Sequence, residues 1–257
     1  MTVASASLEK ASPQVHVFAD KAALVAAATE QVLELIQTAI ATRGRCSIAL
    51  AGGSTPKPLY QALAQANLPW DQLFIYWGDE RYVPITHDDS NAKMTYEAWL
   101  NHVAIPAKNI FTVPTATDSP QTSADQYQQA LSTSFGDALA DMPQFDIILL
   151  GMGDDGHTAS LFPYTTALNE TERWVTVGQK DEQPRITFTA PLINQARHVM
   201  FLVAGANKQM ALSQVFADDA DSATYPARLI DPVGELRWLL DQDASQGLPI
   251  AIERTVH

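Results

Sequence analysis

The stretch FDIILLGMGDDGHTASLFP, residues 145–163, decides how the chain folds. Within it, Ile147–Leu150 is a continuous run of β-forming apolar residues, which is typical of a strand buried on both faces in a parallel sheet. Glycines and aspartates follow, as in a tight turn. Residues 158–162 are then expected to begin a helix. The pattern predicts a buried strand, a glycine-rich loop and a helix start.

The loop of this stretch places His157 at the carboxyl edge of the predicted sheet. Open α/β sheets bind ligands at that edge, beyond the ends of their strands. Histidine is the side chain whose proton exchange falls most readily near neutral pH. A single histidine is nevertheless more often structural or solvated than catalytic, so the loop by itself leaves both interpretations open.

Length and composition favour one large unit. The 257 residues can bury a substantial core, and no Gly/Ser-rich linker or long charge run divides them. We therefore expect a flexible N-terminal tail over residues 1–13 and a single α/β catalytic domain over residues 14–257. The one cysteine, Cys46, adjoins an apolar run and is expected to be buried and reduced, which favours a cytoplasmic location.

The charge and motif content exclude several classes of function. A net charge of −13 opposes binding to nucleic acid or to an anionic membrane, because both require a basic surface. No apolar run approaches the length of a membrane span, and the N-terminus lacks the features of a secretory signal. No His, Cys and carboxylate set has metal-ligand spacing, and the glycines of GMGDDG do not follow the dinucleotide fingerprint, so neither a metal nor NAD is expected.

A second predicted strand, residues 47–51, leads into GGSTP. Ser54 or Thr55 is expected to cap a helix that has Pro56 near its start. The amides and hydroxyls of such a helix start suit a phosphate group. An ordinary strand-to-helix turn has the same pattern, and for GGSTP in isolation it is slightly favoured. Ser54 is better read as a hydrogen-bond donor than as a nucleophile, because GGSTP is not a GxSxG elbow.

A third predicted strand, Leu73–Trp77, brings Asp79, Glu80 and Arg81 to the same edge. Three charges after a strand are often only solvated. Two carboxylates beside an arginine can also bind an anion or transfer a proton. The charged residues therefore point either to a solvated loop or to part of a site.

A further predicted strand, His198–Val203, is followed by Lys208 in the first turn of a helix. A cation at a helix N-terminus opposes the helix dipole, which is easier to understand if Lys208 faces an anion. The other expected strands cover Gln14–Phe18, residues 109–113, 174–177, 185–189 and 248–252. The other expected helices cover residues 20–43, about 91 onward, 122–139 and 231–241.

Seven segments occur in order between residues 47 and 241: AGGSTPKPLY, WGDERYVP, NAKM, FDIILLGMGDDGHTASLFP, PRITFTAP, GANK and WLLD. In this order they resemble the 6-phosphogluconolactonase family. The resemblance implies a three-layer α/β/α fold with a mostly parallel, open, Rossmann-like sheet, shared with glucosamine-6-phosphate deaminase and ribose-5-phosphate isomerase. It also implies a cytosolic pentose phosphate enzyme that hydrolyses 6-phospho-D-glucono-1,5-lactone to 6-phosphogluconate and needs no cofactor.

The same resemblance implies which residues bind the substrate phosphate. The GGSTP motif assigns Gly53, Ser54 and Thr55 to the phosphate. The PRITFTAP and GANK motifs add Arg185 and Lys208. These cations would be the local exception in a strongly acidic chain.

For the reacting end of the substrate, the resemblance implies Asp79 and Arg81 near the sugar and His157 as the general base. A lactone carbonyl is already electrophilic, so hydrolysis needs mainly a positioned water, a base and donors for the oxyanion, without a metal. We expect His157 to take a proton from the water that attacks C1 and to return it to the departing ring oxygen. Asp155 would orient the imidazole, and Arg81 or loop amides would stabilise the oxyanion.

Two alternative functions fit the same fold. The motifs of an isomerising glucosamine-6-phosphate deaminase resemble DEY and DGHIAFNEP, whereas here Arg81 replaces the aromatic residue and TASLFP contains no acid. The chain could also be a non-catalytic sugar-phosphate sensor, although it has neither a basic patch nor spare length for a DNA-binding module. The expected partner is a small sugar-phosphate lactone. The oligomeric state stays open, and a monomer is plausible.

Overall fold

Strands and helices alternate along most of the chain, and the computed structural model describes residues 13–136 and 142–257. The predicted tail, residues 1–13, therefore lies almost wholly outside the described residues. The strands are β1 (Gln14–Phe18), β2 (Cys46–Leu50), β3 (Leu73–Trp77), β4 (Asp79–Arg81), β5 (Ile110–Phe111), β6 (Ile147–Leu150), β7 (Val175–Lys180), β8 (Gln183–Phe188), β9 (His198–Val203), β10 (Glu235–Asp241) and β11 (Thr255–Val256). The helices are α1 (Lys21–Arg43), α2 (Lys57–Leu63), α3 (Asn91–Ala98), α4 (Pro120–Phe135), α5 (Ala190–Asn194), α6 (Gln209–Val215) and α7 (Gln242–Ser245).

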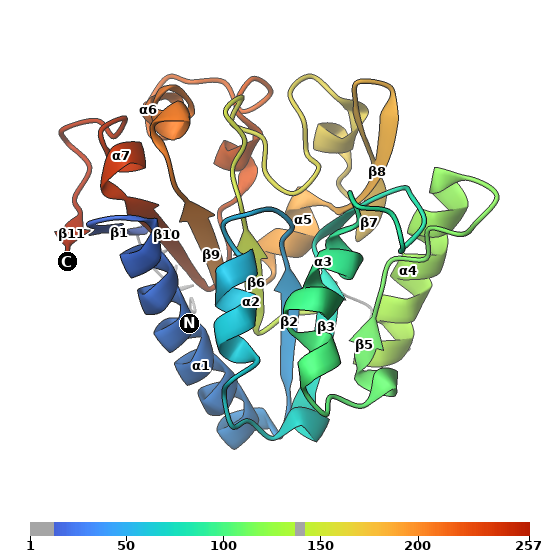
Figure 1. Cartoon of the computed structure of the whole chain (residues 1–257). Helices are drawn as coiled ribbons and strands as arrows, with labels where there is room; N and C mark the ends of the chain where they lie inside the picture. The colour runs from blue at the N-terminus through green and yellow to red at the C-terminus, as the bar shows by residue number, and fades with distance from the viewer. Residues whose placement is uncertain (1–12, 137–141) are drawn as a thin grey trace, which may run out of the picture.

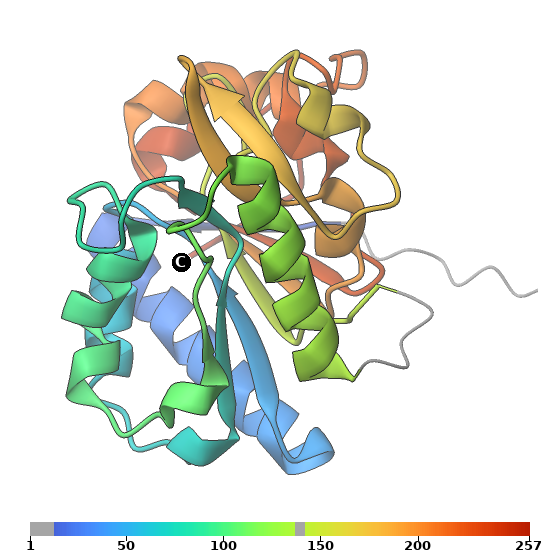
Figure 2. The same ribbon diagram turned by 90° about the vertical axis from the view of Figure 1, so that its right-hand side faces the viewer.

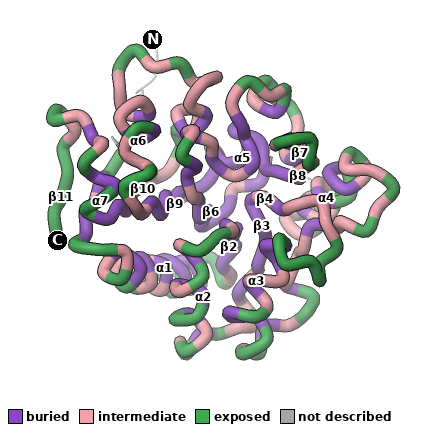
Figure 3. The backbone as a smooth tube through the Cα atoms, turned by 45° about the horizontal axis from the view of Figure 1, so that its top comes forward, coloured by how far each residue is buried: buried purple, intermediate pink, exposed green. Residues whose placement is uncertain are grey.

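The main sheet confirms the expected α/β/α architecture. Eight strands follow the order β11-β1-β10-β9-β6-β2-β3-β5, and every neighbouring pair is parallel. Helices α1, α2 and α3 lie on one face, and α4 and α5 lie on the other (Figures 1 and 2). The central strands are buried on both faces, and the exposed segments are the peripheral loops (Figure 3). Because both faces of the central strands are buried, these strands can be continuous apolar runs such as IILL.

Helix α1 supports one face of the sheet. Its N-cap, Asp20, accepts a hydrogen bond from the backbone N–H of Ala23 at 2.9 Å, and Gly44 ends it in the left-handed conformation at φ 75°. By length and composition α1 could cross a membrane, which corrects the expectation that no apolar run reaches that length. A buried core helix of a soluble protein passes the same test. The apolar stripe of α1 packs against β1, β2 and β10.

Strands β2 and β6 lie side by side at the centre, and the chain leaves them in opposite directions. After β2 the chain passes through α2 to β3 on one side, whereas after β6 it returns as β9 on the other side. Such a divergence leaves a crevice outside the carboxyl ends of the two strands, where open α/β sheets bind ligands. These ends lie at the top of the molecule in Figure 1.

A second, three-stranded antiparallel sheet, β4-β8-β7, lies above this edge and was not expected from the sequence (Figure 1). Strands β7 and β8 form a hairpin whose turn contains Asp181 and Glu182, both at positive φ. Strand β4 continues from β3 after Gly78 and pairs with β8, so that Arg81 lies opposite Arg185. The small sheet thus carries the GDER and PRITF segments over the crevice.

Three expected elements are wrong. Residues 158–162 form no helix, because Ala159 adopts φ 47° and Thr158 donates its hydroxyl hydrogen to the carbonyl of Gly151 at 2.8 Å. Residues 231–241 form no helix either, since β10 inserts between β1 and β9. Residues 248–252 are not a strand, and the strand that reaches the sheet edge is β11. For residues 231–241, pairing with β1 and β9 overrode the local pattern.

Several boundaries also differ by a few residues; for example, β5 covers only Ile110–Phe111 of the strand expected over residues 109–113. The helix expected over residues 122–139 is α4, which begins after the Ser119 cap and ends before Gly136. Residues 137–139 lie outside the described residues. Pro120 occupies the first helical position, where its missing N–H costs nothing.

The position of β10 gives a stability prediction. Trp238 is only 2% exposed, and its ring stacks on Phe201 with centroids 3.8 Å apart. Trp238→Ala should therefore lower the free energy of unfolding by roughly 3–5 kcal/mol, measured by urea denaturation. The control Ile250→Ala removes a side chain that is 96% exposed and should change it by less than about 0.5 kcal/mol. Equal effects of the two substitutions would contradict a central β10.

Candidate active site

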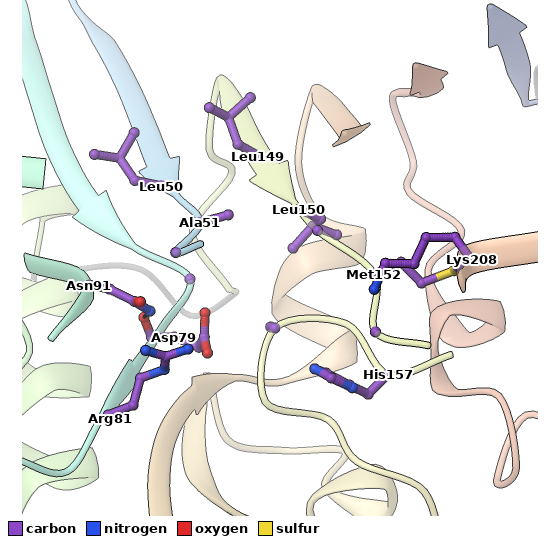
Figure 4. A pocket seen from close by; sticks show the side chains of 15 residues that line it. Leu50, Ala51, Asp79, Arg81, Asn91, Leu149, Leu150, Met152, His157 and Lys208 are labelled. Carbon is purple, nitrogen blue, oxygen red and sulfur yellow. Dashed lines mark hydrogen bonds between the residues drawn. The ribbon is translucent and has the colours of Figure 1, made fainter. Parts of the chain in front are cut away.

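A cavity of about 240 Å³ opens where β2 and β6 end. Figure 4 shows His157 facing Asp79 and Arg81 across it, while Lys208 enters from another side. All four were predicted from the sequence, and the structure brings them together. The rest of the lining is mostly apolar or glycine, from the ends of β2, β3 and β6. The site is therefore a small, partly apolar cavity with a few converging polar groups, as is typical of a ligand site.

His157 is held by Asp155. Its Nδ1 lies 2.5 Å from Oδ1 of Asp155, which also accepts the backbone N–H of His157 at 3.1 Å. Partial burial raises the pKa of Asp155, but the hydrogen bonds and charge of His157, with a smaller contribution from Lys180, lower it to about 2. An ionised carboxylate only accepts hydrogen bonds, so Nδ1 carries the proton. In the neutral imidazole, this places the lone pair on Nε2.

The loop that carries His157 depends on glycines at two positions. A Cβ at Gly153 would lie 2.1 Å from Nδ1 of His157, so no larger residue fits beside the imidazole. Gly156 adopts φ 77°, which L side chains rarely tolerate, and its carbonyl accepts the N–H of Ala227 at 2.9 Å. The backbone N–H of Gly153 donates to the carbonyl of His157 at 2.9 Å. These contacts explain the spacing of the DGH motif.

The opposite wall comes from β4. The carboxylate of Asp79 accepts the hydroxyl hydrogen of Ser160 at 2.7 Å, which ties the GDER segment to the loop of His157. Nη1 of Arg81 donates to the carbonyl of Asp89 at 2.6 Å. The guanidinium is thus oriented by a neutral acceptor, and its charge stays available to a ligand. This arrangement suits an anionic or developing negative charge.

Glu80 is a structural anchor. Its side chain is only 2% exposed and accepts backbone N–H groups from Arg81, Asn91 and Ala92 at 2.7–2.8 Å. Burial raises the pKa of Glu80, while the backbone donors oppose that shift. The carboxylate lies at the N-terminus of α3 and fixes β4 to that helix. Of the three charged residues of GDER, only Asp79 and Arg81 line the cavity.

A second cavity, of about 410 Å³, adjoins the first and shares Gly52, Gly151, Met152 and Lys208 with it. This second cavity is lined by Gly53, Ser54 and Thr55, the three residues that the family resemblance assigned to the substrate phosphate. The expected cap is wrong, because α2 begins at Lys57 after Pro56 and neither hydroxyl bonds to its amides.

Arg185 lies apart from both cavities. It occupies β8 opposite Arg81, and its guanidinium has no hydrogen-bond or ion-pair partner among the described residues. Burial and the charge of Arg81 lower the pKa of Arg185. The sequence analysis assigned both Arg185 and Lys208 to the phosphate, but only Lys208 lines a cavity. The role of Arg185 in phosphate binding stays a prediction.

Sequence reasoning assigned no role to several residues that line the cavities, among them Asn91 and Lys21. Asn91 packs so closely that a Cβ at Gly52 would lie 1.8 Å from its Oδ1, and its Nδ2 donates to the carbonyl of Asp79 at 2.9 Å. Asn91 belongs to the NAKM segment, which contributed to the family resemblance but was assigned no functional role. Lys21 lines the second cavity from the first residue of α1. The reasoning used for Lys208, a cation at a helix start, would have identified Lys21 as well.

Within residues 13–136 and 142–257, no group of three or more His, Cys, Asp or Glu side chains is arranged to hold a metal ion. Cys46 is buried in β2, as expected, and burial raises the pKa of its thiol. Its thiol is therefore unsuited to nucleophilic chemistry. The candidate chemistry rests on His157 and the surrounding charges.

These features define an α/β protein with a candidate ligand site at the switch point of an open parallel sheet, where a histidine–carboxylate pair lies beside a cavity lined by cations. The sequence matches the family described as Glucosamine-6-phosphate isomerases/6-phosphogluconolactonase over residues 19–238. A 6-phosphogluconolactonase of Synechocystis sp. is 55% identical over 237 residues, covering 92% of this chain and 99% of that protein. The chain therefore belongs to this family.

Solved structures agree with this assignment. The structure of 6-phosphogluconolactonase from Trypanosoma brucei matches with a TM-score of 0.81 and 32% identity, covering 93% of this chain and 99% of that chain. A monomeric glucosamine-6-phosphate deaminase matches with a TM-score of 0.76 and covers 90% of this chain and 98% of that chain. At 19% identity the deaminase shows the fold alone.

The hydrogen bond between Asp155 and His157 gives a kinetic prediction. Asp155→Asn replaces an acceptor by an amide that can donate to Nδ1, which favours the tautomer with its proton on Nε2. Turnover should fall by roughly 10²–10⁴, as expected for a base held in the wrong tautomer. Asp154→Asn, at an exposed position of the same loop, is the matched control and should retain turnover. Similar rates for both variants would show that Asp155 does not orient the base.

The lowered pKa of Asp155 also sets a pH dependence of stability. A carboxyl whose folded-state pKa is depressed stabilises the fold above its ordinary pKa of about 3.9, and this contribution is lost as pH falls towards the folded value. The difference in unfolding free energy between wild type and Asp155→Asn should therefore narrow as pH falls from 5 towards 2. Urea denaturation at several pH values measures it. A difference that grew over this range would contradict the assigned pKa.

Proposed function

We propose that the chain hydrolyses 6-phospho-D-glucono-1,5-lactone to 6-phosphogluconate, as a 6-phosphogluconolactonase of the oxidative pentose phosphate pathway. The 55% identity to the Synechocystis 6-phosphogluconolactonase, over nearly the whole length of both proteins, supports this activity. The observation that carries the chemistry is the Asp155–His157 pair at the cavity where β2 and β6 end. A base with a free Nε2 at a ligand cavity is what lactone hydrolysis requires.

His157 acts as the general base in the proposed mechanism. Its Nε2 removes a proton from a water molecule while the water oxygen forms a bond to the lactone carbon C1. The carbonyl π electrons move to oxygen, giving a tetrahedral oxyanion and an imidazolium. When the oxyanion collapses, the bond between C1 and the ring oxygen breaks, and the imidazolium returns its proton to that oxygen. Asp155 stabilises the imidazolium between the two transfers.

Arg81 is the proposed partner of the oxyanion. It faces His157 across the cavity, and its guanidinium is already oriented by the carbonyl of Asp89 (Figure 4). A preorganised cation stabilises developing charge without reorganisation during the reaction. Asp79, held by Ser160, is placed to accept hydrogen bonds from sugar hydroxyls. A loop amide remains the alternative oxyanion donor.

The second cavity is the proposed site for the phosphate. Gly53, Ser54, Thr55 and Lys208 line it, and Lys208 also lines the first cavity. A substrate with its lactone carbon at His157 and its phosphate at Ser54 and Thr55 would occupy both cavities at once. The cations there locally oppose the net charge of −13. A cytoplasmic location, expected from the use of cysteine, remains part of the proposal.

The deaminase alternative has no observation in its favour beyond the fold. The loop after His157 supplies Ser160 rather than a carboxylate, and Ser160 is committed to Asp79. A sensor without catalysis would not need the Asp155–His157 pair. The discriminating experiment follows hydrolysis of fresh 6-phosphogluconolactone by the purified chain against the spontaneous rate. A rate equal to the spontaneous one would exclude the lactonase.

His157→Ala should reduce turnover by roughly 10²–10⁴ while KM changes little, because general-base catalysis is lost and the phosphate contacts remain. The melting temperature should change little, because the imidazole lies at the cavity surface and not in the core. His102→Ala, an exposed histidine outside both cavities, is the control. Full turnover in His157→Ala would remove His157 from the mechanism.

The geometry ranks the two predicted phosphate cations. Lys208 lines both cavities and Arg185 lines neither, so Lys208→Ala should raise KM for the phosphorylated lactone more than Arg185→Ala does. Loss of a charge-assisted contact corresponds to roughly 1.5–3 kcal/mol, or about 10- to 150-fold in KM. Steady-state kinetics of both variants at one ionic strength provide the measurement. A larger effect at Arg185 would reverse the ranking and imply that β8 moves over the bound substrate.

A further inference from the structure

The second cavity contains one cation that has no assigned role. Its charged lining consists of Lys21, Lys208 and Asp241. Asp241 is already engaged, since its carboxylate accepts the backbone N–H of Gly205 at 3.0 Å and that of Ala244 at 2.8 Å. Two lysines and one carboxylate therefore line the cavity, and the carboxylate already accepts hydrogen bonds from the backbone.

Lys21 is half-buried, and within the described part of the chain its side-chain ammonium has neither a hydrogen-bond nor an ion-pair partner. Its neighbour Asp20 caps α1 through the N–H of Ala23 and forms no ion pair with Lys21. Two unpaired lysines that line one cavity repel each other across it. Asp241 supplies only one negative charge against the two lysines, so the lining favours an additional anion in the cavity.

The location of Lys21 follows from the topology. It is the first residue of α1, directly after β1, and Lys208 follows β9. Strand β10 separates β1 from β9 in the sheet, and all three are parallel, so their carboxyl ends meet at one edge. Across the same cavity lie Ser54 and Thr55, which follow β2. Lys21 and the GGSTP segment thus approach the cavity from different strands.

We propose that Lys21 is a second phosphate-binding cation, one that makes the chain specific for the phosphorylated lactone. The inference rests on the proposed function, whose phosphate site it completes. A phosphate monoester carries a charge of about −1.5 to −2 at neutral pH, which one lysine offsets only in part. Lys21 and Lys208 together match it. Arg185, which lines neither cavity, does not supply the second charge in this arrangement.

The test compares Lys21→Met, which keeps the length of the side chain but removes its charge, with Lys57→Met. Lys57 is an exposed lysine in the first turn of α2, near the same loop but outside both cavities. Both substitutions lower the net charge equally, so long-range electrostatics is matched. For each variant, kcat and KM are measured with 6-phosphogluconolactone and with unphosphorylated glucono-1,5-lactone. Competitive inhibition by inorganic phosphate and thermal melting are measured on the same preparations.

Lys21→Met should raise KM for the phosphorylated lactone by roughly 5- to 20-fold and weaken phosphate inhibition similarly, as expected for one charge-assisted contact in a partly exposed cavity. Hydrolysis of the unphosphorylated lactone and the melting temperature should stay unchanged. Lys57→Met should match wild type throughout, and Lys21→Arg, which keeps the charge, should recover most of the affinity.

Two results would overturn the assignment of Lys21. One is an unchanged KM and unchanged phosphate inhibition in Lys21→Met. The other is an equal loss with both lactones or a lowered melting temperature, which would make Lys21 a structural residue. Failure of the proposed function gives a different result, because wild type itself would then not exceed the spontaneous rate.

Discussion

The site depends on how β2 and β6 are paired. At the amino end, Asp146 clamps the two strands, because its carboxylate accepts both the backbone N–H and the hydroxyl hydrogen of Ser47 at 2.7 and 2.8 Å. Arg43 at the end of α1 donates to the same carboxylate at 2.8 Å. The ladder between the strands contains only Ile48↔Ile147 and Ala49↔Ile148. Beyond it the connections diverge, and the cavity forms at the end where no pairing holds the strands together.

Most of the polar side chains around this opening already form hydrogen bonds within the protein. Asp79 is bound to Ser160, the Arg81 guanidinium to a backbone carbonyl, and Asp155 to His157. Each contact joins segments that are distant in the sequence or fixes a side chain within its loop. Among the residues that the structure describes, the Nε2 of His157 and a few charges without an ion-pair partner remain for a ligand, as is expected of a preorganised site. The small antiparallel sheet contributes by holding β4 over the opening.

Much of the fold could be read from local pattern. Continuous apolar runs located β2, β3, β6 and β9, because strands covered on both faces need no polar alternation. Cap residues located α1 and α3. The failures were at elements whose identity depends on neighbours. ELRWLLD is apolar enough for either a helix or a strand, and its insertion between β1 and β9 makes it a strand.

The sequence by itself determined the parallel sheet, the loops at its carboxyl edge and the residue types gathered there, including His157 and Lys208, because glycines and apolar runs act locally on the chain. Only the tertiary structure decided which of those residues share a cavity. It placed Lys208 at the junction of two cavities, turned Glu80 into an anchor for α3, left Arg185 outside and brought in Lys21. The physical reason is that strand order, and not distance along the chain, decides which loops meet.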